Sequence, residues 1–113
     1  MSFDEGLAQR VREALGSRPF VTERQMFGGL AFLLEGKMVV GVSGSKLMAR
    51  VGPERYEDAL ALPHVRKMDF TGKPLRGYVY IDPPGLADDS TLEAWVSWCA
   101  GHVAGLPPKK SSR

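Results

Sequence analysis

Residues 24–51, "RQMFGGLAFLLEGKMVVGVSGSKLMARV", contain three runs in which apolar side chains recur at every second position. The runs centre on residues 30–34, 38–42 and 47–51, and short glycine-containing turns separate them. Period-two alternation interrupted by such turns is typical of antiparallel strands joined by hairpins. This segment therefore predicts a three-stranded antiparallel meander.

Two glycines, Gly28 and Gly29, follow Met26 and Phe27 at the entry to the first predicted strand. Glycine within a strand pattern marks a bulge, a bend or a close approach of two backbones. We expect at least one of the pair to have a positive φ or to lie in a bulge. A tertiary bend is the simplest role, and a contact point for a partner or ligand is the alternative.

Around the meander the sequence predicts three helices and two more strands. Capping boxes, in which a serine precedes a glutamate by three residues, start the first and last helices, and a proline starts the middle one. The expected elements are a helix over residues 3–15 with Ser2 and Glu5, a short helix after Gly52-Pro53, strands over residues 65–70 and 77–82, and a helix over residues 91–104 with Ser90 and Glu93. The predicted fold is α+β, with a two-layer, five-stranded, mainly antiparallel sheet, helices on one face and the order α-β-β-β-α-β-β-α.

Composition is that of an ordinary globular domain, with 113 residues, 43% of them hydrophobic and 25% charged. We expect one domain over residues 1–106 and a disordered basic tail over residues 107–113. Cys99 is the only cysteine, which favours a reducing, cytoplasmic compartment. The first residues lack a long apolar run, so we expect no signal peptide or membrane segment.

Residues that carry chemistry are sparse. His64 and His102 lack a second histidine or cysteine at metal-binding spacing. Cys99 falls on the apolar stripe of the last predicted helix, which indicates a buried thiol rather than a nucleophile. We therefore expect a protein without enzymatic activity, metal or cofactor.

One sheet face carries the candidate interaction residues. Alternation places two tyrosines, a methionine and two cations on the face away from the helices, and no remaining segment is expected to cover it. These residues are Tyr78, Tyr80, Met48, Lys46 and Arg50, with Leu33 and Val39 nearby. Such a mixture is enriched at protein interfaces, and aromatic, basic sheets also stack RNA bases. Alternatively, the long side chains only shield the sheet.

Trp98 is the sixth candidate residue, because it lies off the apolar stripe of the last predicted helix. It is either a lid over a sheet edge or an exposed anchor. The expected partner is another protein or a second copy of this chain, in a homodimer. A nucleic acid is the alternative, although the net charge of +2 is small. A small molecule is a further alternative, which a pocket lined by Arg50, Tyr78 and Tyr80 would favour.

The chain resembles the N-terminal domain of the TfoX/Sxy family, the bacterial competence regulators. The resemblance lies in residues 24–51, in "GKP" at 72–74, in "GYVYIDP" at 77–83 and in the tryptophan-bearing last helix. It covers about residues 5–105, and its most specific part is the Met-Phe-Gly-Gly start. It implies the element order given above and a non-enzymatic protein in transcriptional or competence regulation, with no catalytic residues to carry over.

Overall fold

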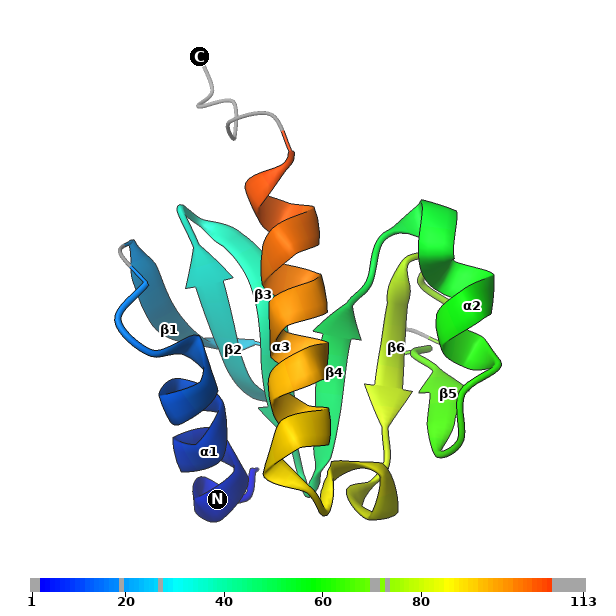
Figure 1. Ribbon diagram of the computed structural model, residues 1–113, viewed down its shortest axis with the longest axis horizontal. Helices are drawn as coiled ribbons and strands as arrows, with labels where there is room; N and C mark the ends of the chain where they lie inside the picture. The colour runs from blue at the N-terminus through cyan, green and yellow to red at the C-terminus, as the bar shows by residue number, and fades with distance from the viewer. Residues whose placement is uncertain (1–2, 19, 27, 70–71, 73, 107–113) are drawn as a thin grey trace.

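The structure, a computed structural model, describes residues 3–18, 20–26, 28–69, 72 and 74–106. In these residues an antiparallel sheet carries helices on one face, which confirms the α+β class (Figure 1). The strands are β1 (Val21–Met26), β2 (Gly29–Leu34), β3 (Lys37–Ser43), β4 (Lys46–Arg50), β5 (Val65–Lys67) and β6 (Tyr78–Ile81). The helices are α1 (Glu5–Leu15), α2 (Tyr56–Leu60) and α3 (Asp89–Ala104), with short 3-10 helices η1 (Pro53–Arg55) and η2 (Pro83–Leu86).

The sheet has six strands among the described residues, so the predicted number of five is wrong. Their order is β1-β2-β3-β4-β6-β5, and each neighbouring pair is antiparallel. The additional strand is β1, which pairs with β2 from Val21↔Leu34 to Met26↔Gly29. Met26 therefore ends β1 rather than entering the first strand. Residues 22–25 are exposed, as expected of a polar edge strand.

The turn between β1 and β2 explains the glycine pair. Gly28 has a φ of +73°, which confirms the predicted positive φ. Gly29 opens β2 where the backbone of β3 comes close. A Cβ atom at Gly29 would overlap the carbonyl oxygen of Val42 and lie 2.9 Å from its carbonyl carbon. Gly28 thus allows a positive φ in the turn, and Gly29 allows the backbones of β2 and β3 to lie close together. Phe27 lies outside the described residues.

A bulge in β3 changes the face of one predicted residue. Phe32 pairs with Val40, whereas the next residue of β2, Leu33, pairs with Met38. Val39 is the extra residue, and it packs in the helix-side core. The prediction that Val39 lies near the outer-face residues is therefore wrong, because one inserted residue reverses the alternation locally. Leu33 does lie on the outer face.

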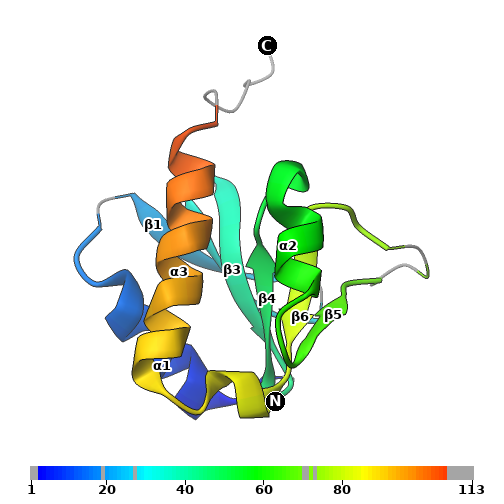
Figure 2. The ribbon, with the colours of Figure 1, turned by 45° about the vertical axis from the view of Figure 1, so that its right-hand side comes forward.

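The helix-side core joins α1 and α3 to the middle of the sheet, and α2 lies beside β5 and β6 (Figure 2). The predicted stripe of α3 is confirmed as buried, and Tyr56 and Ala59 of α2 are buried beside it. The stripe consists of Leu92, Val96, Cys99 and Val103. None of the helices within the described ranges is long and apolar enough to cross a lipid bilayer.

Both long helices begin at residues other than those predicted. The N-cap of α1 is Asp4, whose Oδ1 accepts hydrogen bonds from the backbone nitrogens of Gly6 (2.8 Å) and Leu7 (3.1 Å). Ser2 lies outside the described residues. The N-cap of α3 is Asp88, so Ser90 lies inside the helix and the predicted capping box there is wrong.

Cys99 provides a test of the helix-side core. The thiol is fully buried, and burial raises its pKa to about 12, because the thiolate would lose its hydration. We expect a thiol reagent to label the native protein no faster than the protein unfolds, and to label it rapidly in denaturant. The measurement is the labelling rate in both conditions, with Cys99→Ala as the unlabelled control. Equal rates in buffer and denaturant would contradict the assignment.

Candidate functional site

The predicted alternation on β4 and β6 is correct. Met48 pairs with Tyr80 and Arg50 pairs with Tyr78, so these four side chains share the face opposite the helices. Lys46 lies at the start of β4, two residues before Met48, and belongs to the same face. The structure therefore brings five of the six candidate residues together.

That face is covered, and the prediction that it is open is wrong. Met48 is fully buried and Tyr80 is only 8% exposed. They form an outer core with Ala31, Leu33, Met38 and Met68, against which Met26, Leu75 and Tyr78 also pack. Met68 and Leu75 lie in the connection between β5 and β6, and the Leu75 backbone nitrogen donates to the Met68 carbonyl (2.8 Å). A short segment of the chain therefore covers the face.

Cations lie over the two tyrosine rings of this outer core. Lys46 Nζ is 4.8 Å from the Tyr80 ring centroid, and the Arg66 guanidinium carbon is 5.5 Å from it. The Arg50 guanidinium carbon is 5.6 Å from the Tyr78 ring centroid. A nucleic-acid base would have to displace these cations to stack on either ring.

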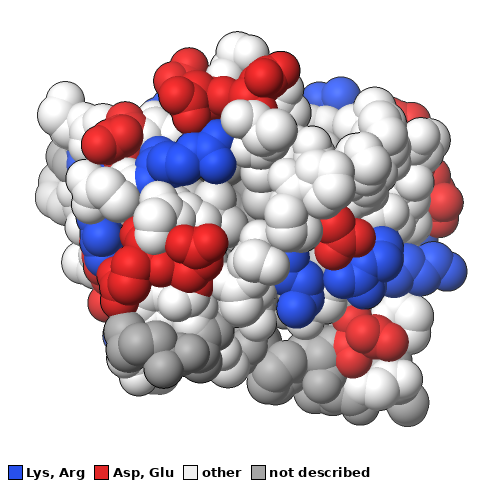
Figure 3. All heavy atoms as spheres, turned by 90° about the horizontal axis from the view of Figure 1, so that it is seen from below, with Lys and Arg blue, Asp and Glu red and all other residues white. Residues whose placement is uncertain are grey.

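Charge is mixed in sign on one face of the molecule (Figure 3). Lys and Arg side chains alternate with Asp and Glu over the face at the N-terminal ends of α1 and α3 (Figure 3). Arg66 donates two hydrogen bonds to Asp82, both 2.8 Å long, and these bonds lower the pKa of the Asp82 carboxyl. Binding of a phosphate backbone calls for an extended surface of one sign, which this face does not provide.

Trp98 lies apart from the other five candidate residues, on the helix side of the sheet. Its ring stacks on that of Trp95, with centroids 5.1 Å apart and planes inclined by 10°. Its Nε1 donates to the Val51 carbonyl (3.2 Å), and the Arg55 guanidinium carbon lies 3.9 Å from its ring centroid. Trp98 is therefore fixed on three sides and only partly exposed.

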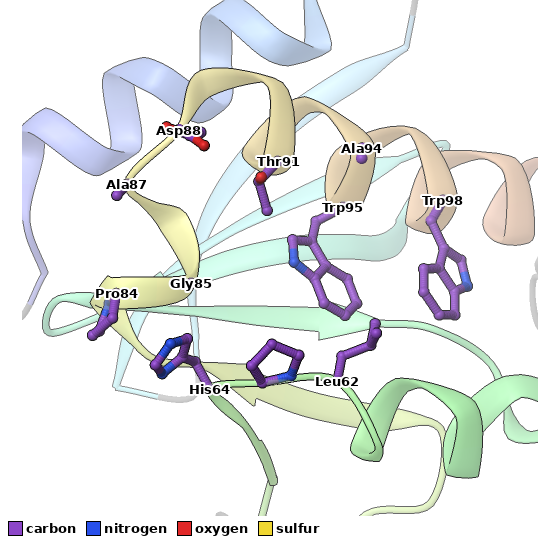
Figure 4. A pocket seen from close by; sticks show the side chains of 11 residues that line it. Leu62, His64, Pro84, Gly85, Ala87, Asp88, Thr91, Ala94, Trp95 and Trp98 are labelled. Atoms are coloured by element: carbon purple, nitrogen blue, oxygen red, sulfur yellow. The ribbon is translucent and has the colours of Figure 1, made fainter.

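A groove of about 470 Å³ begins at the two tryptophans. One wall is α3, and the other consists of η2 and the loop that follows α2 (Figure 4). Trp95, Trp98 and Leu62 lie at one end, whereas His64, Asp88 and Thr91 lie toward the other. The lining is completed by Pro63, Pro84, Gly85, Ala87 and Ala94. The groove thus has an apolar end and a polar end.

The loop that forms the second wall is held firmly. His64 has a φ of +67°, and its carbonyl accepts a hydrogen bond from the Asp82 backbone nitrogen (2.9 Å). Gly85 allows η2 to approach this loop, since a Cβ atom there would lie 2.9 Å from Ile81 Cγ2 and 3.1 Å from His64 Cβ. The groove is therefore formed before any ligand binds.

Leu62 is the residue of this groove that sequence reasoning missed. It is 43% exposed, which makes it one of two large apolar side chains that lie exposed among the described residues. The available signal was Leu62-Pro63 directly after a short helix, a place where a turn is expected. In the part of the chain that the structure describes, no three His, Cys, Asp or Glu side chains group as metal ligands.

The chain was compared with known proteins. No curated protein and no solved structure matches it significantly. The family model of the TfoX N-terminal domain matches residues 13–102, a range that runs from α1 to α3 and includes every described strand and the whole groove. The match spans well over half of the sequence, and so the chain belongs to the TfoX N-terminal domain family.

Proposed function

We propose that this domain is a non-enzymatic, cytoplasmic protein-interaction module, and that the groove beside Trp95 and Trp98 receives an apolar side chain of a partner polypeptide. The observation that carries the proposal is a preformed groove whose apolar end combines two stacked indoles with the exposed Leu62. Buried tryptophans are prominent among the residues that dominate binding energy at protein interfaces. Membership of the family supports a role in transcriptional or competence regulation.

Rigidity of the groove supports binding. Trp98 is held by its stacking on Trp95 and by its hydrogen bond to Val51. A side chain that is ordered before association loses little conformational entropy when a partner arrives, and so more of the contact energy appears as affinity. The buried Cys99 thiol, which needs no disulfide partner, is compatible with the proposed cytoplasmic location.

One charge beside the groove and one in its lining define the chemistry of the partner. Arg55 does not line the groove, but it lies over the ring of Trp98, and within the described ranges it has no ion-pair partner. Asp88 lies at the polar end, exposed and without a side-chain hydrogen bond to the helix it precedes. Charge complementarity therefore favours a segment with an acidic residue near Arg55, a central apolar anchor and a basic residue near Asp88.

The test is selection of a random peptide library on the immobilised domain, followed by affinity measurement with the best synthetic peptide. We expect enriched peptides to carry an apolar anchor next to an acidic residue and to change the tryptophan fluorescence. Leu62→Ala should weaken binding by about 1–2 kcal/mol, roughly tenfold in Kd, because the anchor loses one wall of its site. Ala94→Lys, which places a charge in the same lining, should also weaken it.

Phe20→Ala is the matched control, because Phe20 is the other exposed large apolar side chain and lies outside the groove lining. It should leave peptide affinity unchanged. Peptides that bind wild type, Leu62→Ala and Ala94→Lys equally would contradict the proposal. The mass in solution tests whether the groove is instead occupied by a second copy of this chain. If wild type is a dimer and Leu62→Ala is a monomer, the partner is this chain itself and not a different protein.

A further inference from the structure

A second cavity, of about 580 Å³, lies at the C-terminal end of α3 and shares no lining residue with the groove. It is lined by the end of β4, by η1, by the chain that enters β6 and by the last turn of α3. Its charged and titratable side chains are Arg50, Arg76, His102, Glu54 and Tyr78. We call it the cationic pocket.

Among the described residues, Glu54 is the one carboxylate that lines the pocket, and it forms no ion pair with either arginine. Within the described ranges, neither Arg50 nor Arg76 has an acidic oxygen within ion-pair distance. Each instead lies over an aromatic ring, Arg50 over Tyr78 at 5.6 Å and Arg76 over Tyr56 at 5.4 Å. Stacking on a ring orients the planar guanidinium. Arg50 Nη1 also donates to the Met38 carbonyl (3.4 Å), and the remaining N–H groups of the two arginines can donate to an oxyanion.

The walls of the cationic pocket are fixed by backbone contacts. The backbone nitrogens of Val51 and Gly52 both donate to the Gly77 carbonyl, at 2.8 and 3.0 Å, and join the two sides. Gly52 has a φ of +93°, and a Cβ atom there would lie 2.7 Å from the His102 ring. The imidazole therefore rests directly on bare backbone. The pocket exists before a ligand enters.

His102 reports on the charge inside this pocket. Burial lowers its pKa, the positive charge of Arg50 lowers it further, and the negative charge of Glu54 acts in the opposite direction. An anion bound beside Arg50 would offset that positive charge and favour protonation of the imidazole. Ligand binding and proton uptake by His102 are therefore coupled.

We propose that the cationic pocket binds the phosphate group of a small phosphorylated molecule. A phosphate monoester carries about −1.5 to −2 charges at pH 7 and three acceptor oxygens, which matches two guanidinium forks and an imidazole. A monocarboxylate would satisfy only one fork. The cavity volume lies within the range of small-molecule sites, so it holds more than the phosphate group alone.

Titration with inorganic phosphate and with phenyl phosphate, at constant ionic strength, tests the inference. Thermal stability and the NMR signals of the His102 ring are followed on the full chain. We expect saturable binding of both probes and an upward shift of the His102 pKa at saturation, which a purely structural histidine would not show. Arg76→Ala and Arg50→Ala should each weaken phosphate binding about tenfold or more, since each removes charge-assisted hydrogen bonds. Glu54→Gln should strengthen it.

Arg24→Ala, an exposed arginine of β1 outside the pocket, is the matched control and should bind phosphate as wild type does. Because Arg76 is exposed, Arg76→Ala should fold normally, and it therefore tests the proposal even if Arg50→Ala unfolds. Phosphate affinity that is unchanged in Arg76→Ala would overturn the proposal, as would a response to phosphate no larger than the response to acetate. Binding of duplex DNA that depends on both arginines, without binding of phenyl phosphate, would also overturn it.

Discussion

Gly29→Ala is expected to destabilise the domain by about 3 kcal/mol or more. The added Cβ atom would overlap the Val42 carbonyl oxygen and lie within 3.0 Å of the Ser43 Cα atom. Both atoms belong to the backbone of β3, which is held between β2 and β4, so neither can rotate away as the tip of a side chain would. The substitution must separate β2 from β3 or bend one of them. Urea unfolding with a two-state fit measures the loss.

Gly101→Ala is the matched control for Gly29→Ala. Gly101 lies in α3, is exposed, and has open space where its Cβ atom would be. Alanine is favoured over glycine within a helix by up to about 1 kcal/mol, so this variant should be slightly more stable than wild type. If the two variants have the same stability, the contact between Gly29 and β3 is not tight, and the spatial argument for this glycine is wrong.

The strands inside the sheet could be predicted from the sequence because burial imposes alternation on them. β1 could not, because an edge strand buries little. Its residues from Thr22 to Gln25 are exposed, and it is held by the backbone ladder with β2 and by the ion pair between Glu23 and Arg12. Because Arg12 lies 11 residues before Glu23 in the sequence, their ion pair produces no alternating pattern from which a strand could be predicted. The bulge at Val39 could not be predicted either. Val39 is followed by another valine, so the sequence looks equally apolar with or without an extra residue in the strand.

The candidate site shows the difference between the orientation of a side chain and its exposure. Alternation correctly placed Met48 and Tyr80 on the face away from the helices. Whether another segment covers that face depends on contacts between distant residues, here Met68 and Leu75. The same reasoning identified Trp98 as lying off the core stripe but could not identify the loop opposite it. Leu62 reaches the groove only because η2 and α3 fold back beside α2.

Tyr80→Ala is expected to cost about 3 kcal/mol or more of stability. The ring is 8% exposed, packs against the fully buried Met48 and Met68, and lies beneath Lys46 and Arg66. Truncation opens a cavity in the small outer core and removes the surface on which both cations rest. Urea unfolding measures the loss, and the mass in solution should not change.

Tyr80→Phe separates the ring from its hydroxyl group. It keeps the packing and both cation contacts, so its stability should lie within about 1 kcal/mol of wild type. Tyr78→Ala should cost less than Tyr80→Ala, because Tyr78 is only partly buried at the margin of the same core. A small loss in Tyr80→Ala, together with a change in self-association, would mean that Met68 and Leu75 do not cover the sheet in solution. In that case the outer face of the sheet, and not the groove, would be the proposed interaction surface.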